Sequence, residues 1–89
     1  MTRRFENRVA AVIGGGSGMG RAICRRLAAE GAHVYVADLN GGAAKTVTEE
    51  ILAQGYLAQA EEVNATSLAD LRGLFDRIGQ RAYAGRKLL

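Results

Sequence analysis

Five glycines stand within the seven residues from Gly14 to Gly20, directly after a short apolar run. Gly14, Gly18 and Gly20 follow the spacing G-x-x-x-G-x-G; no register gives G-x-G-x-x-G, and no lysine completes a phosphate loop. Glycine permits positive φ and leaves no Cβ to block a ligand. Because the first N–H groups of a following helix favour negative charge, the segment predicts a site for an anion such as a pyrophosphate. A flexible turn without a ligand is the alternative.

Asp38 is the second residue whose position suggests chemistry, because it follows the apolar run 33–37 and lies 20 residues after Gly18. A carboxylate at the end of such a strand accepts hydrogen bonds from the adenosine ribose of NAD, and it repels the 2′-phosphate of NADP. No basic residue lies within 15–17 or just after Asp38 to offset that charge. An aspartate that only caps a loop is the alternative. The glycine turn and Asp38 together predict a dinucleotide site that prefers NAD.

The elements that must position these residues alternate along the chain. The apolar runs 9–13 and 33–37 predict buried parallel strands, and 57–63, interrupted by polar residues, predicts an edge strand. Helical segments follow each strand, so the predicted order is β-α-β-α-β-α. Short connections between alternating strands and helices indicate right-handed crossovers. We therefore expect an α/β fold, a partial Rossmann-type doubly wound parallel sheet, with residues 1–89 forming one partial dinucleotide-binding domain.

Three segments have the apolar spacing of helices, over 19–30, from Asn40 to Gln54, and from Ser67 onward. Asn40 and Ser67 are typical N-cap residues, and Asp70 completes a variant of the capping box. The side chains expected to face the sheet are Met19, Ile23, Leu27, Ala43, Val47, Ile51, Leu68, Leu71, Leu74, Phe75 and Ile78.

The composition excludes several classes of protein. The chain has 89 residues, 48% hydrophobic and 24% charged, with a net charge of +3, as in an ordinary soluble α/β domain. Arginines gather at 3–8 and 21–26, but no aromatic residues interleave with them, so we expect a solvated surface and no nucleic-acid partner. The single cysteine, Cys24, cannot form an intrachain disulfide. Without a long apolar stretch or a secretory leader, we expect a cytoplasmic protein with no membrane partner. No metal site is predicted.

These residues resemble the short-chain dehydrogenase/reductase family. That family has T-G-x-x-x-G-x-G after its first strand, and Ile13 stands here where its threonine would be. The resemblance continues through 29–34, 36–39, 64–66 and 74–76, and it spans roughly residues 7–79. It implies an NAD-dependent oxidoreductase that moves hydride between nicotinamide and an alcohol or carbonyl substrate, with this chain as its NAD(H)-binding portion.

The resemblance also implies roles for individual residues. The residues facing the cofactor phosphates would be Gly14, Ser17, Gly18, Met19 and Gly20; those facing the adenosine would be Asp38 and Leu39; those near the adenine would be Asn64 and Ala65. The family commonly has aspartate where Asn64 stands. The Asn64 side-chain oxygen can still accept from the adenine amino group, more weakly than a charged acceptor.

No catalytic residue is assigned. Tyr83 and Lys87 match the family's Tyr-x-x-x-Lys spacing, but they follow the third helix directly. The position of the family's serine is occupied by Asp70. We interpret the match as chance, and the tail 81–89 as the approach to a fourth strand that is missing. Turnover by these 89 residues alone is therefore not expected.

Three hypotheses remain open from the sequence. The chain is either part of such an enzyme or a module that binds adenine nucleotides without catalysis. It could also act only through self-association, because the strand 9–13 would be central in the sheet order 3-2-1-4 and would present an open edge without a fourth strand. We accordingly expect a homo-oligomer.

Overall fold

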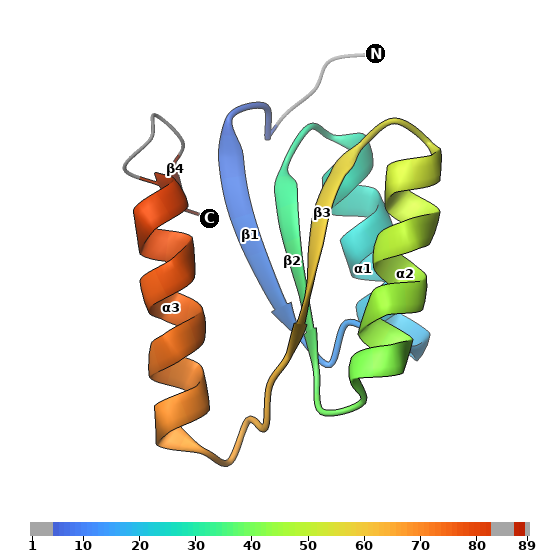
Figure 1. Cartoon of the computed structure of the whole chain (residues 1–89). Helices are drawn as coiled ribbons and strands as arrows, with labels where there is room; N and C mark the ends of the chain where they lie inside the picture. The colour runs from blue at the N-terminus through green and yellow to red at the C-terminus, as the bar shows by residue number, and fades with distance from the viewer. Residues whose placement is uncertain (1–4, 83–86, 89) are drawn as a thin grey trace.

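The computed structural model describes residues 5–82 and 87–88. The strands are β1 (Arg8–Ile13), β2 (His33–Asp38), β3 (Leu57–Glu62) and β4 (Lys87–Leu88), and the helices are α1 (Gly18–Ala29), α2 (Gly41–Ala53) and α3 (Leu68–Ala82). The strands form one parallel sheet in the order β3-β2-β1-β4. Helices α1 and α2 cover one face of the sheet and α3 covers the other (Figure 1). The predicted partial Rossmann-type fold is confirmed, as is the edge position of β3.

Strand β4 corrects the predicted order, which ended at the third helix. It pairs with β1 in parallel, with Arg8 opposite Lys87 and Val9 opposite Leu88. A strand of two residues is defined by its pairing with β1 and is too short to show an apolar pattern of its own. Hydrophobic periodicity could therefore not reveal it. Lys87 lies in a strand rather than on a helix with Tyr83, which falls outside the described residues.

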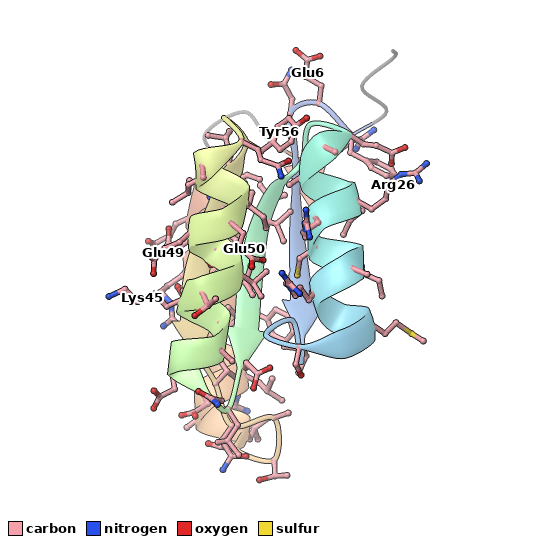
Figure 2. The ribbon with its side chains drawn as sticks, turned by 90° about the vertical axis from the view of Figure 1, so that its right-hand side faces the viewer. Glu6, Arg26, Lys45, Glu49, Glu50 and Tyr56 are labelled. Atoms are coloured by element: carbon pink, nitrogen blue, oxygen red, sulfur yellow. The ribbon has the colours of Figure 1, made fainter. Side chains whose placement is uncertain are left out.

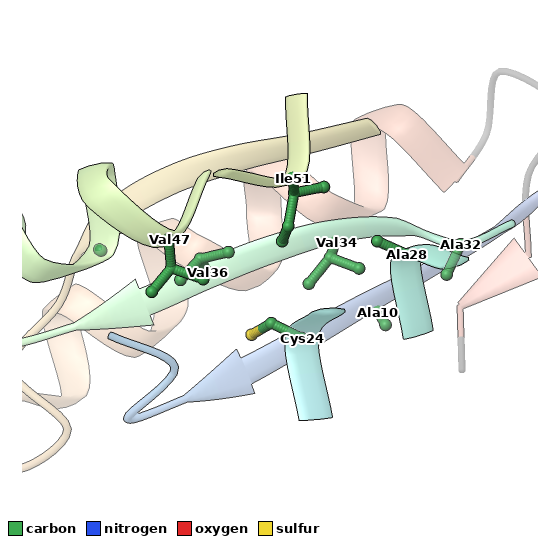
Figure 3. Packing of buried hydrophobic residues seen from close by; sticks show 9 residues of the cluster. Ala10, Cys24, Ala28, Ala32, Val34, Val36, Val47 and Ile51 are labelled. Carbon is green, nitrogen blue, oxygen red and sulfur yellow. The ribbon is translucent and has the colours of Figure 1, made fainter. Parts of the chain in front are cut away.

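The core between the sheet and helices α1 and α2 consists mainly of small and β-branched side chains (Figure 3). The prediction for the inner face of α1 is confirmed only for Leu27, which is partly buried and packs against this core. Met19 and Ile23 are 80% and 43% exposed, and Cys24 and Ala28 are buried instead. The reason is steric, because α1 begins so close to the glycine turn that only small side chains fit beneath it. Hydrophobic periodicity identifies an apolar stripe, whereas close packing selects residues by volume.

Helices α2 and α3 follow their predicted faces more closely. In α2, Val47 and Ile51 are buried as expected. In α3, Leu74 and Ile78 are buried against the opposite face of the sheet, whereas Phe75 is 54% exposed. Leu68, at the start of the same helix, is also exposed. No helix in the described part of the chain is long and apolar enough to cross a membrane.

Both predicted N-caps form. The Asn40 side-chain oxygen accepts from the N–H of Ala43 at 3.0 Å. The Ser67 hydroxyl oxygen accepts from the N–H of Asp70 at 3.2 Å. These bonds satisfy donors that the first turn of a helix otherwise leaves free, and they fix where the chain turns from β2 into α2 and from β3 into α3.

Candidate functional site

The predicted site residues lie in and next to three loops at one edge of the sheet. Strands β1, β2 and β3 are parallel, so their carboxyl ends meet at the same edge (Figure 1). In open α/β sheets, ligands bind at this edge. After β1, Gly14 and Ser17 lie in the turn, and Gly18, Met19 and Gly20 form the first turn of α1. Asp38 ends β2 and Leu39 follows it, and Asn64 and Ala65 lie in the loop after β3.

The glycine turn is held against the end of β2 by its backbone. The N–H groups of Gly14 and Gly15 both donate to the carbonyl oxygen of Ala37, at 2.7 and 3.0 Å. Gly14 and Gly18 have φ of 79° and 54°, a region that other residues rarely adopt. A Cβ at either position would meet no atom within 4 Å, so both glycines border open space. The turn therefore presents bare backbone outward while its base is fixed.

The N-terminus of α1 has no cap from its own side chains. Its N-cap residue, Ser17, makes no side-chain cap hydrogen bond, and the first turn holds no acidic residue. This differs from α2 and α3, whose first turns are capped by Asn40 and Ser67. The first N–H groups of α1 thus keep their positive partial charge next to the bare glycine turn. That combination fits an anion with several oxygens, such as a pyrophosphate.

Asp38 is fixed between the glycine turn and the start of α2. One carboxylate oxygen, Oδ2, accepts from the N–H of Gly16 at 3.0 Å, and the other, Oδ1, accepts from the N–H of Asn40 at 2.9 Å. The residue is partly exposed, and an ionised carboxylate can accept more hydrogen bonds than these two, so acceptor capacity is left. A carboxylate held this way is ready to accept hydrogen bonds from a diol.

Asn64 is placed at this edge, but its side-chain oxygen is already occupied. That oxygen accepts from the N–H of Thr66 at 2.9 Å and from the Thr66 hydroxyl at 2.7 Å. The Asn64 N–H in turn donates to Asp70 Oδ2 at 3.0 Å. A carbonyl oxygen has two lone pairs, so Thr66 uses both. An adenine amino group would have to displace the Thr66 hydroxyl to reach this acceptor.

Apolar and backbone groups complete the edge. The side chains of Met19 and Leu39 are 80% and 69% exposed. Ala65 is exposed beside Asn64. Such apolar groups around a polar centre suit a planar base better than they suit water. Within the described residues, no group of three His, Cys, Asp or Glu residues is placed to hold a metal ion.

Residues 8–86 match the protein family described as short chain dehydrogenase. This match covers most of the chain, including all three loops of the candidate site. The chain belongs to the short-chain dehydrogenase family.

Several members of the short-chain dehydrogenase family are similar to this chain. An oxidoreductase named YuxG from Bacillus subtilis is 42% identical over 84 residues, which are 91% of this chain and 12% of the relative. Cyclohexanol dehydrogenase from an Acinetobacter species is 39% identical over 72 residues, or 81% of this chain and 29% of the relative. The chain therefore spans less than a third of either relative.

A solved structure shows the same fold. The 7α-hydroxysteroid dehydrogenase in complex with NADH and 7-oxo glycochenodeoxycholic acid superposes with a TM-score of 0.84 at 34% identity. The match covers 90% of this chain and 31% of that one. The fold of this short-chain dehydrogenase chain thus matches about a third of a longer protein.

Sequence analysis gave no role to Gly16, although this glycine joins the two central features of the site. Besides donating to Asp38, it leaves no room for a side chain: a Cβ there would lie 2.8 Å from the Cβ of Ala43 and 2.9 Å from Asp38 Oδ2. The signal was present as a third consecutive glycine in the turn. Its meaning depends on the distance between the turn and α2, which spacing along the chain does not contain.

An ion pair connects α1 to α2. The Arg21 guanidinium donates to Glu50 from Nε at 2.9 Å and from Nη2 at 2.6 Å. The hydrogen bond and the charge of each partner raise the pKa of Arg21 and lower the pKa of Glu50. Glu50 lies between the two helices in Figure 2. Arg21 is exposed, as expected, and this ion pair links the two helices that flank the site.

Cys24 lies beneath the glycine turn, where burial raises the pKa of its thiol to about 11. We predict that Ellman's reagent does not react with the folded chain at pH 8 and reacts with one thiol in denaturant, because only the thiolate is nucleophilic. A thiol whose pKa is about 11 when folded and 9.0 when unfolded loses its proton first in the unfolded chain. The free energy of unfolding should therefore fall as pH rises from 9.0 toward about 11.

The control is Cys24→Ala, which lacks this titration. The difference in unfolding free energy between the wild type and Cys24→Ala should narrow over that pH interval. A difference that does not change with pH would contradict the placement of Cys24.

Proposed function

We propose that this chain is the NAD(H)-binding portion of a short-chain oxidoreductase that acts on an alcohol or carbonyl substrate. The observation that carries the proposal is the carboxylate of Asp38, fixed to the glycine turn through Gly16 at 3.0 Å. This bond joins the proposed ribose acceptor to the proposed phosphate-binding turn. A flexible glycine loop or an isolated capping aspartate would not require such a connection.

The residues present fit the cofactor in three respects. The first N–H groups of α1, uncapped by Ser17, face where a pyrophosphate would lie. Gly14 and Gly18 border open space, which lets phosphate oxygens approach the backbone. Asp38 would accept from the ribose hydroxyls. When bound, the cofactor would accept hydride from an alcohol in its oxidised form or donate hydride to a carbonyl in its reduced form. This chain's residues would bind and orient its adenosine and pyrophosphate.

The preference for NAD over NADP follows from charge. A fixed carboxylate at the end of β2 repels a 2′-phosphate, and no described cation forms an ion pair with Asp38. The steroid dehydrogenase that shares the fold was solved with NADH, which supports the same preference here. The related cyclohexanol and hydroxysteroid dehydrogenases support an alcohol or carbonyl as substrate, without narrowing its structure.

The test is a titration of the purified chain with NADH, in which the fluorescence of the nucleotide measures binding. Only the adenosine and pyrophosphate half of a site is proposed here, so we expect a Kd of about 0.2 to 1 mM, which corresponds to about −4 to −5 kcal/mol. NADPH should bind more weakly. A chain that is folded by circular dichroism and binds neither nucleotide at several millimolar would refute the proposal.

Asn64→Asp should tighten NADH binding about three- to tenfold. One carboxylate oxygen can keep the two bonds to Thr66, and the second oxygen can accept from the adenine amino group as a charged acceptor. Titrations of both forms at equal ionic strength measure the change. Thr66→Ala is the companion variant, because it frees one acceptor position without adding charge. Unchanged binding in both variants would exclude a contact between residue 64 and the adenine.

Self-association is a second candidate, favoured by the incomplete pairing of β1. On the side of β4, only Arg8 and Val9 have strand partners among the described residues, so 10–13 present backbone groups at an edge. Such edges recruit other strands. We propose a homo-oligomer joined at this edge.

Static light scattering should detect this oligomer at high protein concentration. Ile13→Lys, which places a charge at the edge, should shift the chain toward monomer. A wild-type chain that is monomeric at all concentrations would contradict this candidate.

A further inference from the structure

Glu62 is a second carboxylate at the ribose end of the candidate site, and sequence analysis assigned it no role. It is the last residue of β3, and the parallel register pairs it directly with Asp38 at the end of β2. Residues that pair across neighbouring strands project to the same face of the sheet, and the strands lie about 4.8 Å apart. Asp38 and Glu62 therefore share one face at one edge.

The contacts of Glu62 confirm which face this is. A Cβ built on Gly41, the first residue of α2, would collide with the carboxylate oxygen Oε1 of Glu62 and lie 3.2 Å from its Cδ. Asp38 reaches the same segment, because its Oδ1 accepts from the N–H of Asn40. The two carboxylates thus flank the start of α2 from neighbouring strands, and glycine at position 41 leaves room for the second one.

The charge of Glu62 is not neutralised by a neighbour. Among the described residues, the ion pairs of glutamates join Glu30, Glu50 and Glu61 to arginines, and none includes Glu62. Its side chain is exposed. An exposed carboxylate without an ion-pair partner repels another negative charge over a range of about 8 to 10 Å at ordinary ionic strength.

We propose that Glu62 is a specificity-determining residue that, together with Asp38, excludes the 2′-phosphate of NADP(H) from this site. This inference rests on the proposed function. Asp38 binds the ribose and repels the phosphate, whereas Glu62 contributes repulsion without a required contact to NAD(H). Glu62 should therefore affect the ratio of the two affinities much more than the affinity for NADH.

The variants Glu62→Gln and Glu62→Lys test this assignment in the full chain, by separate titrations with NADH and with NADPH. Glu62→Gln should lower the ratio of the NADPH Kd to the NADH Kd about three- to fivefold, and Glu62→Lys should lower it at least about tenfold. NADH binding itself should change less than about twofold in Glu62→Gln. Added salt should reduce the differences in this ratio between the wild type and the variants.

Glu49→Gln is the matched control. It removes the same charge on the side of the sheet that α2 covers. Glu49 is exposed on α2 about two turns beyond the start of the helix, and its side chain points outward in Figure 2. It should leave the ratio of the two affinities unchanged.

Each outcome separates this inference from the proposed function. If the wild type and all variants bind NADH with the same ratio of NADPH Kd to NADH Kd, Glu62 has no role in specificity. An equal change in both affinities would show a general charge effect and would also overturn the assignment. If the wild type does not bind NADH, the proposed function fails first, whatever the variants do.

Discussion

Asp38→Ala should weaken NADH binding about 10- to 100-fold. It should also reduce the preference for NADH over NADPH to the part that Glu62 contributes. The variant loses the ribose acceptor, and hydrogen bonds to a charged group contribute about 1.5 to 3 kcal/mol each. It also releases the N–H groups of Gly16 and Asn40, so the glycine turn is no longer tied to the start of α2. NADPH binding should change less, because the lost ribose contact is offset by the lost repulsion. Fluorescence titration with both nucleotides measures each affinity.

Two further variants separate the causes. Asp38→Asn keeps one acceptor oxygen but can accept from only one of the two N–H groups. Its affinity for NADH should therefore lie between those of the wild type and Asp38→Ala. Asp76→Ala removes an equal charge from an exposed position on α3, which covers the opposite face of the sheet. It should leave both affinities unchanged. Equal binding by the wild type and Asp38→Ala would show that Asp38 only caps its loop.

Gly20→Ala should destabilise the chain by about 1 to 3 kcal/mol or more, as expected when a side chain is forced into a packed site. A Cβ at Gly20 would collide with the carbonyl oxygen of Gly14 and lie 3.0 Å from the Cα of Gly15. These neighbours are backbone atoms of the turn, and the turn is held to Ala37 by two hydrogen bonds, so the helix has to move instead. Because the first N–H groups of α1 move with the helix, this variant should also lose NADH binding.

Gly79→Ala is the control for this substitution. Gly79 lies within α3, and a Cβ there would meet nothing within 4 Å. Because alanine is the better helix former, this variant should be neutral or more stable by up to about 1 kcal/mol. Urea unfolding of the three proteins measures the differences. If Gly20→Ala were as stable as Gly79→Ala, the close approach of α1 to the turn would be wrong.

The sequence predicted the features that depend on local pattern. Strand-turn-helix order, the caps Asn40 and Ser67, and the edge position of β3 all follow from residue types within a few positions of each other. The spacing of Gly14 and Gly18 and the position of Asp38 predicted a dinucleotide site, and the structure places these residues together at one edge. The family resemblance added the roles of Ser17, Met19, Leu39, Asn64 and Ala65. Whether they bind NAD(H) remains a prediction.

The features that escaped prediction depend on distances between segments far apart in the chain. The inner face of α1 holds Cys24 and Ala28 rather than Met19 and Ile23, because the helix lies too close to the sheet for large side chains. The occupied oxygen of Asn64 depends on how its own loop turns back at Thr66. The pairing of Glu62 with Asp38 requires the register of two strands, which residue types alone do not specify.

The most direct test of the central claim is an NMR titration of the isotopically labelled chain with NADH. We predict amide shift changes concentrated in three loops, at 14–20, at 38–41 and at 62–66, with little change on α3. The same titration of Asp38→Ala should leave these signals nearly unmoved at equal NADH concentration. Shift changes scattered over the surface, or confined to α3 and the β4 side of β1, would contradict a dinucleotide site at the carboxyl edge of the sheet.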